Sequence, residues 1–378
     1  MEEVLRVIDI FLGRILSVAF EIFPSNKRIK TPAIRKILLI KLWGLGNLTI
    51  IWPLVYKIRE KYPTSSIYFL TFDLNKGFLE RNQVIDRILY FKFTKNIFRI
   101  ITQFISLTTI LRKERIDLVI NFETFNNTSA LFSYLTGAPL RIGINNRYEK
   151  VFYNYSVDNY PSLHISEVFL KLLKPLSINS PYTYYCFSDG KKEQRRVDNI
   201  LRSFGIEKFI LIHPGTSENF KGKRWKSENF AELADLLIEK YNLPIIFTGT
   251  EKEKPLIMRI IENISSKDSV FNTAGMLSIW EFIELLKKSM LFISNDTGPV
   301  HIVASLKGDI ATFYGPTSPH RYRPLNRNSI TFYRQLECSP CVGISYINSR
   351  CKNNFRCMNF SPHEVFLEIS ERFFQENP

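Results

Sequence analysis

The chain has 378 residues, which is too long for one ordinary hydrophobic core and fits two domains of about 150–200 residues each. Its net charge of +15 indicates an anionic partner, such as a nucleotide, an acidic lipid or a phosphorylated glycan. A nucleic acid is not expected, because no basic zipper, zinc-finger spacing or RNP aromatic run occurs. Four of the five cysteines fall between positions 338 and 357, which does not fit a secreted disulfide framework.

The first 35 residues have an amphipathic composition. Residues 4–23 are largely apolar but carry Arg6, Asp9, Arg14 and Glu21, and these charges argue against a membrane-spanning helix. A basic tract over residues 27–36 would add attraction to anionic lipid. The segment either lies on a membrane surface or packs on the rest of the protein. We expect a cytoplasmic protein in either case, and a peripheral one at the inner face of the membrane in the first.

From residue 36 the sequence alternates between short apolar runs and longer helical stretches, such as 49–61 and 97–113. Continuous runs of β-branched and aromatic residues between helices indicate parallel strands covered on both faces. We expect residues 36–180 to form a first domain. Its predicted strands are 36–42, 66–72, 87–91, 117–122 and 141–144.

The pattern breaks over residues 158–208, where prolines and a polar aromatic stretch precede a highly charged helix. A second series of strands and helices follows, so residues 181–378 are expected to form a second domain. Its predicted strands are 209–215, 243–249, 269–275, 290–296 and 309–315. We infer two doubly wound α/β domains that face a central cleft. In such sheets ligands bind at the carboxyl ends of the strands.

A glycine-containing loop links the first strand to its helix. Gly44 and Gly46 allow close backbone approach and unusual φ angles. The third glycine of a dinucleotide fingerprint is replaced by Thr49, so a nicotinamide site is not expected. A Walker A motif is excluded because the loop lacks Gly-Lys-Ser/Thr.

Residues 292–301, FISNDTGPVH, carry the strongest signal for a ligand site in the sequence. They predict a buried strand, a polar turn and a helix that opens at Pro299. The amides of Thr297 and Gly298 would lie at the helix N-terminus, where phosphate binds readily. Asp296 could accept hydrogen bonds from hydroxyls, and His301 could donate one to a phosphate. This pattern predicts a site for a sugar joined to a diphosphate.

Other turns of the second half are expected to converge on the same site. His213, Gly215 and Thr216 end one strand, and the basic loop with Lys221, Lys223 and Arg224 follows. That loop either contacts phosphate or is simply a solvated basic loop. Gly249 ends the next strand, and Glu253 beyond it either pairs with ribose hydroxyls or complements a helix N-terminus. Ser278 and Glu281 match a capping box and are interpreted as structural.

Together these pieces resemble glycosyltransferase family 9, the ADP-heptose:lipopolysaccharide heptosyltransferases and their relatives. The resemblance runs from about Lys36 to Val365. It rests on KILLIKLWGLGN, WPLVYKIREKYP, IHPGT, KRW, GMLSIWEF, SNDTGPVH, ATFYGPTSP and the terminal cysteines.

The resemblance implies a GT-B fold whose C-terminal domain holds a nucleotide-sugar donor and whose N-terminal domain holds a lipid-linked or phosphorylated glycan acceptor. It also implies inverting, metal-independent transfer, with no cofactor required for catalysis. A carboxylate would deprotonate the acceptor, while lysine and helix-end amides stabilise the leaving diphosphate. Carried over by position, Lys223 would neutralise phosphate, Asp296 would grip sugar hydroxyls, Met276 would lie near the base and Glu253 near the ribose.

One departure concerns the catalytic base. The family's Gly-Asp dipeptide is here Gly46–Asn47, and an amide cannot take a proton at neutral pH, although its carbonyl can orient a hydroxyl. Either Asp73, Glu123 or His164 replaces the base, or catalysis is slow, or the chemistry differs. Two alternatives to a glycosyltransferase therefore stay open: a nucleotide-sugar epimerase and a catalytically silent nucleotide- or glycan-binding protein.

The terminal cysteines are spaced Cys338-x2-Cys341-x9-Cys351-x5-Cys357. This spacing suits a structural zinc ion held by four thiolates. Free thiols in a reducing compartment, or a disulfide formed under stress, are the alternatives. Cys186 is interpreted as a buried residue.

Overall fold

The computed structural model describes residues 33–92, 94, 96–124, 127–145, 149–185, 187, 190–341 and 351–374. The predicted N-terminal segment lies outside these residues, apart from positions 33–35. The chain divides into two compact units, Met1–Thr183 and Tyr184–Pro378.

The first unit contains a parallel sheet whose described strands follow the order β3-β2-β1-β4-β5-β6. The chain moves outward from β1 to β3, crosses back to β4 and then continues outward, which is the doubly wound arrangement. Strand β1 is buried along almost its whole length because its apolar run is covered on both faces. The strands are β1 (Lys36–Ile40), β2 (Ser66–Phe72), β3 (Arg87–Phe91), β4 (Leu118–Asn121), β5 (Leu140–Asn145) and β6 (Tyr155–Asp158).

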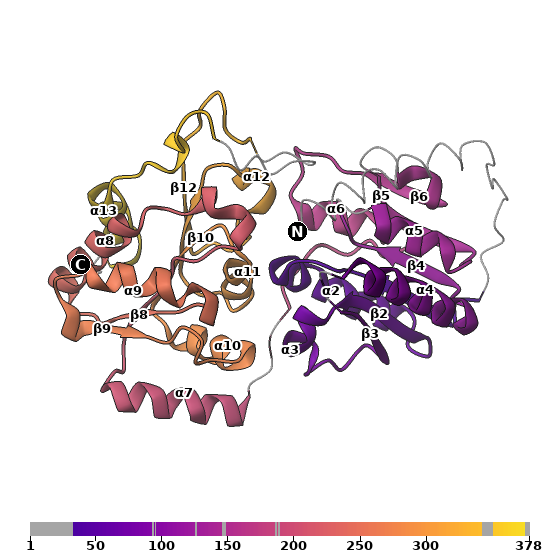
Figure 1. Cartoon of the computed structure of the whole chain (residues 1–378), viewed down its shortest axis with the longest axis horizontal. Coiled ribbons are helices and arrows are strands. Elements are labelled where there is room, and N and C mark those ends of the chain that lie inside the picture. Colours follow the sequence, from indigo (N-terminus) through magenta and orange to yellow (C-terminus); the bar gives the residue numbers. More distant parts are fainter. Residues whose placement is uncertain are drawn as a thin grey trace. The chain divides into compact units, whose positions relative to one another are not determined.

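Helices connect these strands (Figure 1). Helix α2 begins directly after Gly44, whose φ of 88° is a backbone conformation that favours glycine. Helix α2 packs beside α6, and α4 packs beside α5. The helices are α2 (Leu45–Lys61), η1 (Asp73–Asn75), α3 (Lys76–Leu79), α4 (Ile97–Glu114), α5 (Asn127–Leu135), η2 (Glu149–Phe152), α6 (Ile165–Lys171) and η3 (Lys174–Leu176).

The second unit repeats this topology, with its described parallel strands in the order β12-β11-β10-β7-β8-β9. Strands β7 and β10 lie side by side in the middle, so the point where the winding reverses falls between them. Ligands of doubly wound sheets bind at such a point. The strands are β7 (Ile210–His213), β8 (Ile245–Phe247), β9 (Val270–Asn272), β10 (Leu291–Asn295), β11 (Ile310–Tyr314) and β12 (Ser329–Tyr333).

Helices cover this second sheet, with α7 beside α10 and α13 beside α8. They are α7 (Lys191–Phe204), η4 (Glu218–Lys223), α8 (Ser227–Tyr241), η5 (Glu251–Glu253), α9 (Lys254–Glu262), η6 (Lys267–Ser269), α10 (Ile279–Lys288), α11 (Gly298–Ser305), α12 (Pro319–Tyr322), η7 (Arg356–Met358) and α13 (Pro362–Phe373). In the part of the chain that the structure describes, no helix is both long and apolar enough to cross a membrane.

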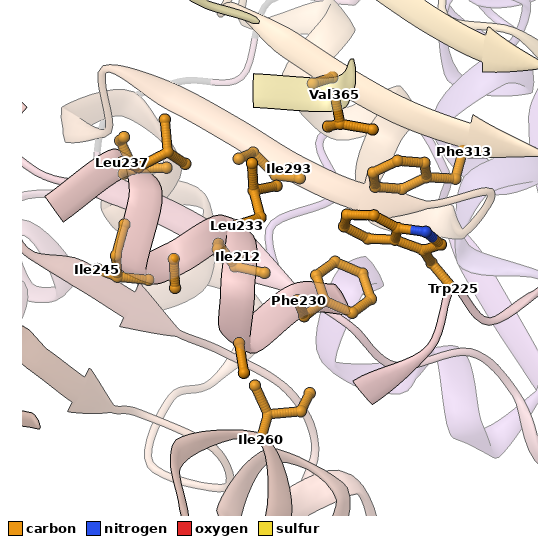
Figure 2. Close-up of a cluster of buried hydrophobic side chains, with 14 of the residues drawn as sticks. Ile212, Trp225, Phe230, Leu233, Leu237, Ile245, Ile260, Ile293, Phe313 and Val365 are labelled. Atoms are coloured by element: carbon orange, nitrogen blue, oxygen red, sulfur yellow. The ribbon is translucent and has the colours of Figure 1, made fainter. Parts of the chain in front are cut away.

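An aromatic group forms one end of the core between α8 and the sheet (Figure 2). The Trp225 ring stacks on Phe313 with centroids 4.4 Å apart, and it meets Phe230 edge-on at 5.0 Å. The Trp225 indole N–H also donates to the carbonyl of Phe360. Trp225 therefore fixes the end of the basic loop that precedes it in sequence.

The ten predicted strands are present, although most are shorter than expected at their carboxyl ends. Two further strands, β6 and β12, were not predicted. Both are edge strands whose sequences, YSVD and SITFY, mix polar with apolar residues. Edge position alone does not explain the omission, because the edge strands β3 and β9 were predicted. The predicted capping box is confirmed, because Ser278 and Glu281 bond each other's backbone at the start of α10.

Candidate active site

The candidate donor site lies at the carboxyl ends of β7 and β10, the point where the second sheet reverses its winding. His213 is the last residue of β7, and Asp296 directly follows β10. Both side chains are largely buried. The polar turns that were predicted to converge are thus contributed by adjacent strands.

A lysine–carboxylate pair lies at the centre of this site. Lys223 Nζ is 2.7 Å from Asp296 Oδ2, and the two side chains are 14% and 9% exposed. Thr317, in the turn after β11, donates a hydrogen bond to the same oxygen at 2.6 Å. Lys223 also lies over the ring of Phe220. Through Asp296, the basic loop and the turn after β11 are both bonded to the turn after β10. Lys223 is therefore held next to the residues that begin α11.

Asn295, the last residue of β10, connects the turn after β7 with the basic loop. Its side chain is fully buried, and its amide donates to the carbonyl of Pro214 at 2.8 Å. Its oxygen accepts from the backbone N–H of Trp225 at 2.9 Å. One amide therefore fixes the turn after β7 and the end of the basic loop at a set separation.

The N-terminus of α11 is the predicted phosphate seat. Thr297 is its N-cap in extended conformation, and Pro299 lies in its first turn, as predicted. Thr297 and Gly298 are partly exposed, whereas His301, one turn on, is buried. This end of the helix can therefore receive an anion on its backbone N–H groups.

Glu253 occupies space beside the turn after β7. Gly215 lies so close to the Glu253 carboxylate that a side chain at position 215 would displace it. His213 Nε2 is 3.7 Å from Glu253 Oε2, and Thr250 donates to the same carboxylate from its N–H and its hydroxyl. Burial of the Glu253 carboxyl acts to raise its pKa, but the interaction with His213 and the hydrogen bonds from Thr250 outweigh burial and bring the pKa to about 2. Glu253 is therefore an anion at neutral pH. It caps η5, which is the second of its two predicted roles, a charge at a helix N-terminus.

Other candidate donor residues have local partners. Arg224 donates to the hydroxyl and the carbonyl oxygen of Thr216, both at 2.9 Å, so these two residues brace each other. Gly249 packs against Glu253 and Ile257. Met276 is 44% exposed in the turn after β9.

In the first unit the winding of the sheet reverses between β1 and β4, and the loop after β1 lies at this position. Lys41 Nζ is 3.1 Å from Glu123 Oε2, and the two side chains are only 1% and 5% exposed. The other oxygen of Glu123 accepts the backbone N–H groups of Leu42 and Trp43. The carboxylate therefore shapes the loop that leads to Gly44. Asn47 follows in the first turn of α2 and is partly exposed.

The three alternatives for a base, Asp73, Glu123 and His164, differ in burial. Glu123 is buried, and its carboxylate is held by Lys41 and by the backbone N–H groups of Leu42 and Trp43. His164 is buried and caps α6, where its Nδ1 accepts from the N–H of Ser166. Asp73 is partly exposed just beyond β2, the strand next to β1.

The cysteines border the donor turns. Cys357 and Met358 pack against Gly315, leaving no space for a side chain there, and Cys341 donates its N–H to the carbonyl of Pro316. Burial and the charges of the other three cysteines raise the pKa of Cys357 to about 11. Among the residues that the structure describes, no group of three or more His, Cys, Asp or Glu is arranged to hold a metal ion. Zinc therefore stays a prediction.

Residues 104–351, more than half of the chain, match the family model for glycosyltransferase family 9 (heptosyltransferase). The chain belongs to glycosyltransferase family 9. It is thus a glycosyltransferase, and the resemblance noted from the motifs is confirmed.

Curated members of family 9 align along most of the chain. Lipopolysaccharide heptosyltransferase 3 of Escherichia coli K12 is 25% identical over 76% of this chain and 85% of its own length. Lipooligosaccharide heptosyltransferase 2 of Haemophilus ducreyi is 24% identical over 78% of this chain and 87% of its own.

Solved structures of family 9 share the fold. The family member from Veillonella parvula superposes with a TM-score of 0.73 at 19% identity, covering 93% of this chain and 100% of that one. E. coli ADP-heptose lps heptosyltransferase II gives 0.70 at 20% identity, with coverages of 91% and 100%. The predicted GT-B architecture of two parallel-sheet α/β domains is confirmed.

Three residues of these networks were missed by the sequence analysis, namely Lys41, Asn295 and Thr317. Asn295 and Thr317 lie in or beside quoted motifs, so their position alone could have indicated them. Lys41 ends an apolar run, and a lysine there gives no sign that its side chain turns inward.

Proposed function

We propose that this glycosyltransferase transfers a heptose from ADP-heptose to a lipopolysaccharide core acceptor, with inversion and without a catalytic metal. The curated relatives support the sugar and the acceptor, because they are named as lipopolysaccharide and lipooligosaccharide heptosyltransferases. A solved structure of a related heptosyltransferase, E. coli WaaC, was determined with ADP, which supports the nucleotide.

The observation that carries the proposal is the Lys223–Asp296–Thr317 network beside the N-terminus of α11. The diphosphate would lie on the amides of Thr297 and Gly298, with Lys223 as the counter-charge for the departing group. Asp296 would hold Lys223 in place and accept hydrogen bonds from the sugar hydroxyls. In this arrangement Lys223 and the amides at the start of α11 together stabilise the leaving diphosphate.

On the acceptor side, Asn47 takes the family's base position. Its carbonyl would orient the acceptor hydroxyl, and the slow step would be removal of the proton. Asp73, in the turn after β2, the strand next to β1, is a partly exposed carboxylate. If it served as the base, Asp73→Asn would abolish transfer while donor binding persists.

The experiment mixes the full-length protein with ADP-heptose and a lipopolysaccharide core lacking terminal heptose, and follows released ADP and the glycosylated product. We expect product with inverted anomeric configuration by NMR and a rate unchanged by EDTA. Asp296→Ala should abolish transfer. Asp198→Ala should not, because it removes only a surface ion pair between Asp198 on α7 and Lys288 on α10. Sugar isomerisation without an acceptor would indicate an epimerase, and binding without turnover a silent protein; either result contradicts the proposal.

A further inference from the structure

Helix α4 of the first unit is apolar on two opposite sides. One side packs into the core through Leu107 and Leu111, and the ring of Phe104 contacts Phe132 at a tilt of 44°. The other side presents Phe98, Ile101 and Ile105 to solvent, with 71%, 50% and 58% of their surface exposed. Residues spaced three and four apart lie on one face of a helix, so these three form a single stripe. Core packing does not account for this outer stripe.

The surroundings of the stripe are cationic. Residues 92–113 contain five Lys and Arg and no Asp or Glu. Of these cations, Lys92 and Arg99 are exposed beside the amino end of α4, and Arg112 continues the stripe at its other end. An exposed apolar stripe with cations beside it and at its end is the composition of helices that lie in a membrane interface.

A neighbouring turn extends the same surface. Leu74 is 67% exposed in the turn after β2, and Lys76 next to it is also exposed. Strands β2 and β3 pair so that Phe72 lies opposite Phe91, which brings the Leu74 turn to the same sheet edge as the start of α4. Asp73 and Glu80 are the acidic residues of that turn region. The connections that follow β2 and β3 therefore both present apolar side chains at the carboxyl ends of these strands.

We propose that Leu74, Phe98, Ile101 and Ile105, with Lys92 and Arg99, form a membrane-docking surface for anionic phospholipid. A second copy of the chain would bring five cations against five and is disfavoured by charge. The chain's own residues 1–32 contain five basic and four acidic residues, a net +1 that does not complement the stripe either. An anionic bilayer complements both the charge and the apolar side chains. If the proposed function holds, this surface would keep the first unit against the lipid that carries the acceptor.

The first test needs neither donor nor acceptor, so its failure is distinct from failure of the proposed reaction. Full-length protein is sedimented with vesicles of phosphatidylglycerol or of phosphatidylcholine alone. Phe98→Asp/Ile101→Asp should bind phosphatidylglycerol vesicles at least about tenfold more weakly than the natural protein. Lys92→Gln and Arg99→Gln should each weaken binding about fivefold. Leu367→Asp is the matched control, because Leu367 is 53% exposed on α13 in the other unit, and it should bind unchanged.

Hydrogen exchange of the unsubstituted protein gives a second, independent readout. Amides of residues 97–106 should become protected when phosphatidylglycerol vesicles are added, and not with phosphatidylcholine. Protection without vesicles that rises with protein concentration would show a second copy on the surface, and protection at every concentration would show the chain's own segment there. Either result, or no protection at all, overturns the proposal.

Discussion

The two units each place a lysine–carboxylate pair across the point where the winding of their sheet reverses. In the first unit Lys41 follows β1 and Glu123 follows β4; in the second, Lys223 lies in the loop after β7 and Asp296 follows β10. The N···O distances are similar, 3.1 Å and 2.7 Å, but the lysines differ in exposure, 1% against 14%. Glu123 also holds two backbone N–H groups, whereas Asp296 holds the hydroxyl of Thr317. Burial therefore gives the first pair a scaffolding role and leaves the second available to a ligand.

The largest effect is expected from Lys223→Ala. Removing a cation that stabilises a leaving diphosphate should reduce transfer about 10³-fold. The unfolding free energy should fall by less than in Lys41→Met, because Lys223 is 14% exposed whereas Lys41 is 1% exposed. Rates with ADP-heptose and urea denaturation measure the two quantities. Lys221→Ala, at an exposed position in the same loop, is the control and should retain most activity. Transfer by Lys223→Ala within threefold of the natural rate would contradict the ligand-binding role.

The first pair should show the opposite behaviour in Lys41→Met. Leaving Glu123 buried without its counter-ion should lower the unfolding free energy by about 3–5 kcal/mol. Lys36→Met is the control, because Lys36 and its partner Glu114 are 37% and 22% exposed, and it should cost less than about 1 kcal/mol. The double variant Lys41→Met/Glu123→Gln should recover part of the loss, because it removes both buried charges. Equal stability of the two single lysine variants would show that the pair is not structural.

Glu253 offers a pH test of the second site. Its folded pKa of about 2 lies below the ordinary 4.5, so the unfolded state binds more protons between these values. Its contribution to stability is complete above pH 4.5 and is lost as the pH falls toward 2. The shift corresponds to roughly 3 kcal/mol. Glu253→Gln should remove that part of the slope in urea unfolding between pH 6 and pH 2.5. Glu251→Gln, at a side chain 71% exposed, should keep the natural slope; identical slopes for the two variants would show that Glu253 is not stabilised in the folded state.

The sequence predicted the inner strands and the turn of α11, because continuous apolar runs and Pro299 have direct local causes. It also predicted the edge strands β3 and β9, but it did not predict β6 and β12, whose sequences mix polar with apolar residues. Within the site, motif position indicated Lys223 and Asp296 but not the partner that each binds. The bond from Thr317 to Asp296 spans 21 residues, and the salt bridge from Lys223 spans 73, and only the sheet order brings them together. The burial of Lys41 and Glu123 could not be predicted from a local pattern either, because the two residues are far apart in the sequence.

The smallest effect is expected from Asn47→Asp, and it tests whether the first unit's loop is short of a base. Asn47 lies in the first turn of α2, which has no acidic residue, so a carboxylate there should add about 0.3–1 kcal/mol of stability through the helix N-terminus. It should also raise transfer about tenfold, because a base would replace an amide that can only orient the acceptor. Asn47→Ala separates the two roles: it removes the orienting carbonyl and should lower transfer below the natural rate without the gain in stability. If Asn47→Asp is more stable but no faster, proton removal belongs to another group, and Asp73→Asn becomes the decisive variant.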